Sequence, residues 1–198
     1  AWANRGNHLY RLERFEEALV AFERSIKIQE NFYPAWYGKA NVLSALGRYD
    51  AAIDSYKKTV KIKPNFYLGW RDQGALFAYL DKPYEALISF NQVIRYNAND
   101  FAVWYLRGNI LTKNFQEYEE AIAAYNKAIQ LKSDFADAWI GKGEAFYRLG
   151  NYEKAREAAK EAVKLKPNDP EVLSFLNALE EHSLPPFPVE SILFFSED

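Results

Sequence analysis

The five tryptophans of this 198-residue chain lie at an almost constant spacing. They are Trp2, Trp36, Trp70, Trp104 and Trp139, so the intervals are 34, 34, 34 and 35 residues. A period of this length is typical of stacked helix–turn–helix arrays, in which each repeat packs against its sequence neighbours. The sequence therefore predicts an all-α chain, an α-α superhelix (solenoid) built from five helix pairs.

Small residues and aromatic rings keep the same period. A small residue follows every tryptophan by four positions, at Gly6, Ala40, Gly74, Gly108 and Gly143. Four of the five second helices carry a ring at a matching position, namely Phe22, Tyr56, Phe90 and Tyr125, whereas the fifth has Ala159. Small residues let two helix axes approach to roughly 8–10 Å. We therefore expect each ring to fill the space beside a small residue of its neighbour, and each tryptophan to be a buried contact between helices.

Glycine and proline mark the predicted turns. Gly47 and Gly150 follow the ends of first helices, and Pro83 stands where a second helix begins. The fourth repeat has one extra residue between Leu111 and Ala121. Its turn is therefore expected to be longer than the others and to bulge.

These residues resemble the tetratricopeptide repeat family. The second repeat shows the family pattern at Trp36, Ala40, Leu43, Ala52, Tyr56, Thr59 and Pro64. The resemblance covers residues 1–169 and implies five units, at 1–32, 33–66, 67–100, 101–135 and 136–169. A capping helix is expected at 170–183, introduced by Asn168-Asp169-Pro170, and an extended tail at 184–198. The resemblance implies a scaffold or adaptor that binds an extended peptide or partner segment in a concave groove, without a cofactor.

In this family the groove is lined by the first helix of each unit, at positions one, five, eight and nine after the tryptophan. The predicted peptide-binding residues are Asn7, Tyr10, Arg11, Tyr37, Asn41, Arg71, Tyr79, Tyr105, Asn109, Lys113, Tyr147 and Arg148. An asparagine amide can both donate to and accept from a peptide backbone, so spaced asparagines can hold an extended chain. Tyrosine adds apolar area with a polar tip. Asparagine at this position is also common family usage.

Several other functions are disfavoured. Family members that grip the C-terminal carboxylate of heat-shock chaperones need lysine and arginine at set positions, and acids such as Asp72 occupy some of them here. The two histidines, His8 and His182, lie at opposite ends of the chain, and there is no cysteine. No phosphate-binding glycine loop or nucleophile with a paired base is present, so we expect neither an enzyme nor a metal site.

Charge and hydropathy indicate whether nucleic acid or a membrane is a partner, and where the protein is located. A net charge of −2 and a pI near 5.9 disfavour nucleic acid. No segment reaches the roughly 18 apolar residues of a membrane span, and no secretory leader is visible. We therefore expect no membrane partner and a cytoplasmic location. The absence of methionine and the abrupt start at Ala1 favour a segment of a longer protein; removal of an initiator methionine is the alternative.

The predicted tail differs in composition from the repeats. Residues 180–198 hold five acidic and no basic side chains, whereas residues 1–179 hold 25 basic and 22 acidic ones. The tail could begin the next domain, pack on the capping helix, or dock in a groove of its own or a neighbouring chain. Fifteen extended residues reach about 50 Å, so docking within one chain is limited to the half with Lys113, Tyr147 and Arg148. Two other roles stay open, a self-associating structural array and the regulatory arm of a larger enzyme.

Overall fold

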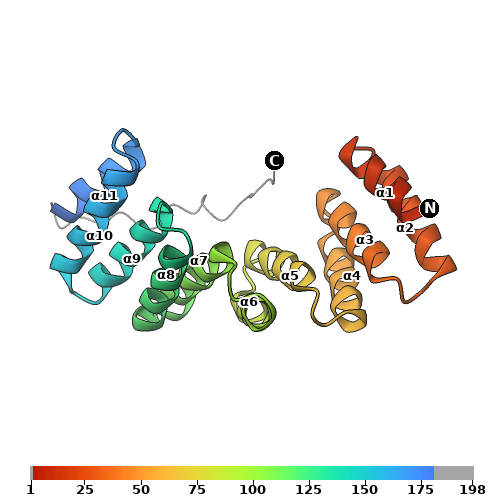
Figure 1. The fold of residues 1–198 in the computed structure, drawn as a ribbon, viewed down its shortest axis with the longest axis horizontal. Coiled ribbons are helices and arrows are strands. Elements are labelled where there is room, and N and C mark those ends of the chain that lie inside the picture. Colours follow the sequence, from red (N-terminus) through yellow and green to blue (C-terminus); the bar gives the residue numbers. More distant parts are fainter. Residues whose placement is uncertain (1, 181–198) are drawn as a thin grey trace. The chain divides into compact units, whose positions relative to one another are not determined.

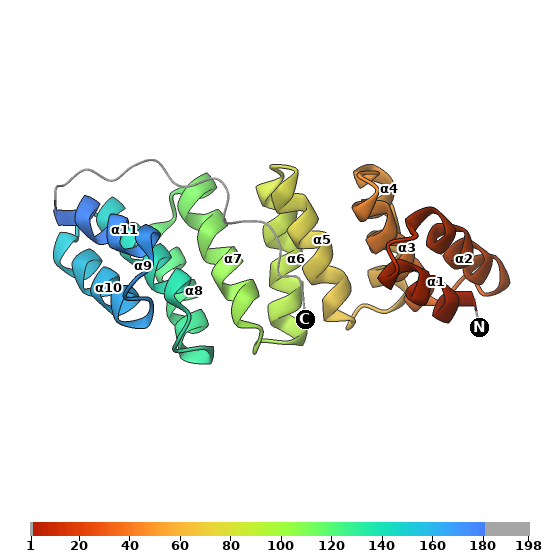
Figure 2. The same cartoon turned by 90° about the horizontal axis from the view of Figure 1, so that it is seen from above.

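The computed structural model describes residues 2–180 and divides them between two compact units, which are described separately. Residue 1 and residues 181–198 lie outside the described residues, so the predicted tail and the end of the predicted capping helix do too. Every regular element in the described part is helical, as the sequence predicts. Neighbouring helices within a unit lie side by side (Figures 1 and 2).

Unit 1, residues 1–96, consists of three helix pairs. They are α1 (Trp2–Arg11) with α2 (Phe15–Ile28), α3 (Tyr33–Ala45) with α4 (Tyr49–Ile62), and α5 (Tyr67–Tyr79) with α6 (Pro83–Tyr96). Unit 2 begins at residue 97. It contains α7 (Phe101–Ile110) continued by a π-helical turn η1 (Leu111–Phe115), then α8 (Tyr118–Leu131), α9 (Ala136–Arg148), α10 (Tyr152–Leu165) and α11 (Pro170–Glu180).

The predicted fit of rings against small residues is confirmed. The Phe22 ring, 1% exposed, lies between Gly6 of its own pair and Gly38 of the next. A Cβ atom built at Gly6 would come 2.8 Å from that ring. In unit 2, Tyr125 has the same place between Gly108 and Gly141, where added Cβ atoms would come 2.6 Å from ring carbons. Because Phe22 and Tyr125 each contact two successive first helices, each of these two rings joins one helix pair to the next.

The prediction that each tryptophan is buried is wrong, since all five are only partly buried. The indole Nε1 of Trp36, Trp70 and Trp104 donates to the backbone carbonyl oxygen of the residue six positions earlier, at 2.7, 2.8 and 2.9 Å. Those carbonyls belong to the loops that precede α3, α5 and α7. An indole needs a partner for its N–H, so the ring sits at the edge of the helix pair, where it fastens the incoming loop.

The turns follow the glycine and proline pattern. Gly47 and Gly150 adopt φ of +71° and +74°, which favours glycine, and α6 begins at Pro83. The extra residue of the fourth repeat is taken up inside the helix. A π turn absorbs one additional residue per turn, and η1 is followed by Gln116, which has a φ of 58°. The expected bulge is therefore present, but as the last turn of a helix.

Helix α11 begins at Pro170. The Asp169 carboxylate accepts from the backbone N–H groups of Glu171 and Val172, at 3.0 and 3.3 Å. Its Val172 and Leu179 are 1% and 2% exposed, and they pack with alanines of α9 and α10. This helix therefore covers the apolar face of the last helix pair.

Candidate functional site

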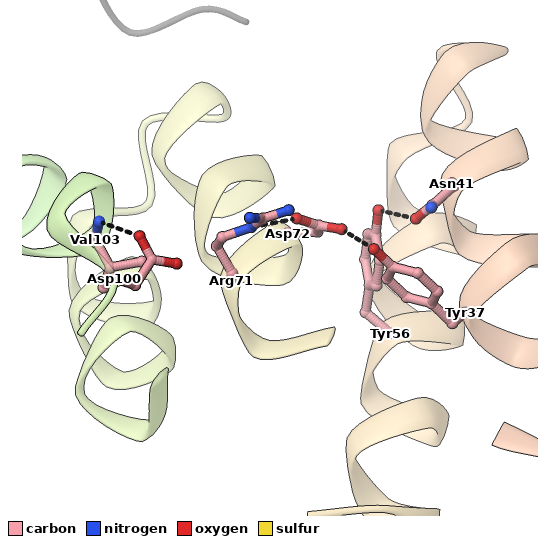
Figure 3. Close-up of polar contacts among 7 residues, drawn as sticks. All are labelled: Tyr37, Asn41, Tyr56, Arg71, Asp72, Asp100 and Val103. Atoms are coloured by element: carbon pink, nitrogen blue, oxygen red, sulfur yellow. Dashed lines mark hydrogen bonds and ion pairs between the residues drawn. The ribbon is translucent and has the colours of Figure 1, made fainter. Parts of the chain in front are cut away.

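A cluster of side chains around Asp72 lies on helices α3, α4 and α5 of unit 1 (Figure 3). The Tyr37 hydroxyl of α3 donates to Asp72 Oδ2 at 2.5 Å, and Arg71 Nε donates to Asp72 Oδ1 at 3.1 Å. Burial and the Asp72 carboxylate together raise the pKa of Tyr37, and the same two causes raise the pKa of Tyr10 on α1. Three successive first helices, α1, α3 and α5, and the second helix α4 thus contribute to one group, which we call the Asp72 cluster: Tyr10, Tyr37, Tyr56, Arg71 and Asp72.

Two asparagines of the predicted site have tyrosine partners. The Tyr56 hydroxyl donates to Asn41 Oδ1 at 2.7 Å, and the Asn41 amide donates to the Tyr37 hydroxyl. In unit 2, the same arrangement recurs with Tyr125, Asn109 and Tyr105, and the Tyr125–Asn109 distance is 2.8 Å. The Asn109 side chain is buried, with 3% of the residue exposed, whereas Asn41 is half-buried. The structure therefore shows these amides fixing the orientation of tyrosines.

The tyrosine rings of this arrangement are also packed alike in the two units. The Tyr37 and Tyr56 ring centroids are 6.2 Å apart, and the Tyr105 and Tyr125 centroids are 6.1 Å apart. A phenylalanine that immediately precedes the next first helix packs edge-on against the first tyrosine of each set, at 5.0 Å. These phenylalanines are Phe66 and Phe135. Such contacts hold rings at fixed angles.

The remaining predicted residues of unit 1 lie nearer to solvent. Asn7 and Arg11 are exposed, and Tyr10 and Tyr79 are 37% and 46% exposed. The Tyr79 ring stacks edge-on against Tyr49, at 5.3 Å between centroids. The structure therefore brings Tyr10, Tyr37, Asn41 and Arg71 together around Asp72 and places Tyr79 in a separate pair with Tyr49.

In unit 2, a buried carboxylate pairs with the predicted Arg148 and interacts electrostatically with the predicted Lys113. Glu144 of α9 is only 6% exposed and is the one charged residue among the buried polar residues of the described part. Arg148 Nη2 lies 3.4 Å from Glu144 Oε1, and Lys113 of η1 is close enough to lower the pKa of the same carboxyl. We call Lys113, Glu144 and Arg148 the Glu144 cluster. Tyr147 instead packs against Tyr152, at 5.2 Å between ring centroids.

Burial dominates the electrostatics of Glu144. Removal from water raises the pKa of its carboxyl to about 7, against the opposing effect of Arg148 and Lys113. Burial likewise lowers the pKa of the Lys113 ammonium group, while Glu144 opposes that change. A carboxyl with this pKa exists in both charge states near neutral pH, unlike an ordinary glutamate.

The sequence analysis missed Glu144 and assigned no binding role to Asp72. Glu144 stands five residues after Trp139, which is the register of Asn7, Asn41 and Asn109. At the position where the other second helices carry a ring, α10 has Ala159. Comparison of that one register across the repeats would have identified Glu144. Asp72 stands two residues after its tryptophan, which is the position at which Gly38 and Gly141 contact a ring in other repeats. An acid there is a comparable departure from the repeat pattern.

No metal or membrane feature is found within residues 2–180. No group of three or more histidine, cysteine or carboxylate side chains is placed to hold a metal ion there. None of the helices in that range combines the length and apolar character that crossing a bilayer requires.

Comparisons with known proteins agree with the repeat pattern. Models described as tetratricopeptide repeat match residues 1–32 and 33–66, and residues 71–134 and 114–170. A search of curated proteins gives no match. The chain resembles the solved structure of YrrB, titled a TPR protein with an unusual peptide-binding site, with 23% identity and a TM-score of 0.79 over 87% of this chain and 89% of that one.

MamA structures are similar in the same way. One matches with 20% identity and a TM-score of 0.78, covering 94% of this chain and 96% of that one. Another, from Desulfovibrio magneticus RS-1, matches with 22% identity and a TM-score of 0.77, covering 85% and 95%. At these identities the likeness shows the fold, and the family models match more than half of the chain. The chain therefore belongs to the tetratricopeptide repeat family and has its α-α superhelix fold.

Proposed function

We propose that this chain is a protein-interaction module that binds an extended peptide or partner segment on the faces formed by its first helices. The observation that carries the proposal is the Asp72 cluster, in which the partly exposed Tyr37 and Arg71 side chains are held by hydrogen bonds to Asp72, and Tyr10 is near enough for that carboxylate to raise its pKa. Tyr10 is 37% exposed, and the Arg71 and Asp72 side chains are 28% and 24% exposed. Side chains fixed before binding lose little conformational entropy when a ligand arrives.

The second helices offer a different surface. Lys57 and Lys58 on α4, and Glu119 and Glu120 on α8, are exposed and charged, as expected of a solvated face. Aromatic residues and arginine, by contrast, are enriched at binding surfaces. YrrB, a TPR protein with an unusual peptide-binding site, has the same fold. We therefore propose that the ligand is a peptide or protein segment. We also propose that it binds to the five repeats, with the boundaries predicted from the sequence.

The test is a selection of extended 12-residue peptides against the full chain, followed by affinity measurements on variants. The double change Tyr10→Ala/Tyr79→Ala removes two exposed rings from first helices and should weaken the selected peptides at least tenfold. Tyr84→Ala is the matched control, because Tyr84 is 70% exposed and lies on the second helix α6. Circular dichroism checks that all variants keep their helicity.

One outcome would contradict the proposal. It is a loss of affinity in Tyr84→Ala with no loss in the double variant. It would move the binding surface to α6, where Tyr84 and Ile88 are 70% and 60% exposed and one helical turn apart. The surface would then be apolar and formed by second helices.

We also propose that residues 184–198 compete with such a ligand. The support is their composition, since an apolar and acidic segment follows a slightly basic array. A tethered segment has an effective concentration on the order of 1 mM, so an intrinsic Kd of about 100 μM would weaken a competitor roughly tenfold. Deletion of residues 184–198 should therefore tighten binding of a selected peptide. Unchanged affinity would leave this segment as a connector.

A further inference from the structure

The Glu144 cluster contains more cations than carboxylates, and this excess of positive charge indicates the chemistry of a ligand. Arg148 pairs with the Glu144 carboxylate and Lys113 interacts with it electrostatically, so the cluster carries a net positive charge when all three groups are ionised. The Glu144 side chain is 8% exposed, whereas that of Arg148 is 41% exposed. Lys113 is partly exposed as well. An approaching ligand therefore meets the cations before it meets the carboxylate.

We propose that Lys113 and Arg148 form a subsite for an acidic side chain of the bound segment, in which the ligand carboxylate takes the place of Glu144 as their partner. This inference rests on the proposed function, because it names one chemical feature of the ligand that the first helices bind. The arginine guanidinium presents several N–H donors in a plane that suits a carboxylate. The lysine ammonium adds a second charge from η1.

The π turn contributes to this arrangement. Thr112, the residue before Lys113, is 5% exposed and its hydroxyl donates to the Gly108 carbonyl at 3.0 Å. It also lies 3.3 Å from the Tyr125 hydroxyl. The turn that carries Lys113 is therefore anchored to the core of unit 2, which positions the lysine near Glu144 instead of leaving it on a free loop.

Binding of an acidic ligand should be linked to protonation of Glu144. When a ligand carboxylate recruits the two cations, an ionised Glu144 would be left buried beside a second negative charge, which is costly. Protonation removes that cost. The groups that face Glu144 are Arg148 on its own helix, Lys113 on η1, and the hydroxyls of Tyr105 and Tyr125 on α7 and α8. The buried face of α10 presents alanines there.

The size of the linkage follows from the charge states of the free protein. With a carboxyl pKa of about 7, roughly nine-tenths of the molecules are protonated at pH 6 and roughly one-tenth at pH 8. If the protonated form binds the acidic ligand, affinity is reduced by the fraction of competent molecules. The ligand should then bind about tenfold more tightly at pH 6 than at pH 8.

Two probes test the inference on the full chain. The acidic probe is a labelled synthetic peptide with the sequence of residues 184–198, and the neutral probe carries Glu190→Gln, Glu197→Gln and Asp198→Asn with an amidated end. The acidic probe should show the tenfold pH effect, and the neutral probe should not. Glu144→Gln should bind the acidic probe at pH 8 as tightly as the wild type does at pH 6. Glu119→Gln, an exposed site on α8, is the control and should keep the pH effect.

The source of the natural carboxylate is decided by the same measurement. If the chain's own tail occupies the subsite, neutralising the three acids in the full chain should tighten binding of the acidic probe. If a partner supplies the carboxylate, that change should leave the probe affinity unaltered.

The outcomes that overturn the inference differ from those that overturn the proposed function. Equal binding of the two probes, or a pH effect that survives in Glu144→Gln, would refute the acidic subsite while leaving peptide binding intact. A pH effect that survives in Glu144→Gln would have to come from a group other than Glu144. Failure of both probes to bind any of the variants would refute the subsite and count against peptide binding on this face.

Discussion

Tyr125→Phe should destabilise the chain more than Tyr56→Phe, although each change removes a hydroxyl from the same register. The two hydroxyls donate to Asn109 and Asn41 at 2.8 and 2.7 Å. Both tyrosines are buried, at 0% and 4% exposure. Their asparagine partners differ, because Asn109 is 3% exposed and Asn41 is half-buried. The comparison therefore isolates the effect of burying the acceptor.

The expected magnitudes follow from what each variant leaves without a partner. In Tyr125→Phe, Asn109 Oδ1 loses its donor in a buried place and Thr112 loses a neighbour at 3.3 Å. A buried polar atom left unsatisfied costs about 1–3 kcal/mol. In Tyr56→Phe, water can reach the half-buried Asn41, so the loss should be that of an ordinary hydrogen bond, about 0.5–1.5 kcal/mol.

Urea unfolding of the full chain, followed by far-UV circular dichroism, measures both losses. Phenylalanine should leave no cavity, since Phe22 and Phe90 occupy the same register in other helix pairs. Amide exchange in α3 and α7 is the second measurement, because repeat arrays can unfold in parts. A loss for Tyr56→Phe that equals or exceeds that for Tyr125→Phe would refute the reasoning.

Three further changes test other parts of the structure. Glu144→Gln should be nearly neutral at pH 4 and stabilise the chain by roughly 3 kcal/mol at pH 8, because folding raises the carboxyl pKa from 4.5 to about 7 and wild-type stability therefore falls as pH rises between those values. Urea midpoints of both proteins across pH measure this, and a stability difference that does not change with pH would contradict it. Gly141→Ala should cost about 1–3 kcal/mol by overpacking, since its Cβ would come 2.6 Å from the Tyr125 ring, and an unchanged melting temperature would argue against that packing. Trp70→Ala should cost about 3 kcal/mol and more than Trp2→Ala, because a terminal helix pair has one neighbour; equal losses in denaturant would count against the array.

The period of the sequence predicted the helix pairs and much of their packing. Gly6 and Phe22 could be matched in advance because both keep the 34-residue spacing and differ greatly in size. Burial of the tryptophans was predicted wrongly. Their constant spacing indicates a structural position, but it does not show that the indole N–H donates to a loop carbonyl and so keeps the ring near the surface. The π turn after Ile110 was foreseen only as a bulge, because the sequence reveals an extra residue but not which hydrogen bonds absorb it.

The candidate site was less predictable than the fold. The register of first-helix positions identified Tyr37, Lys113 and Arg148, but it could not reveal that the asparagines already have tyrosine partners. Those partners come from second helices, about fifteen residues away in sequence, and a hydrogen bond of this kind depends on exact helix rotation. Glu144 is neither an asparagine nor a cation, the residue types that a peptide-binding register predicts at this position. Whether these residues bind a peptide stays a prediction.

The loop-fastening tryptophans have a practical consequence. The indoles of Trp36, Trp70 and Trp104 are half-buried, and each donates a hydrogen bond to a backbone carbonyl of the loop that precedes its own helix. Separation of a loop from its helix would therefore expose one particular indole to water and shift its fluorescence to longer wavelength. Replacing all but one tryptophan by phenylalanine would give a set of chains, each with a natural optical reporter at a known junction, in which opening of the array can be followed one junction at a time.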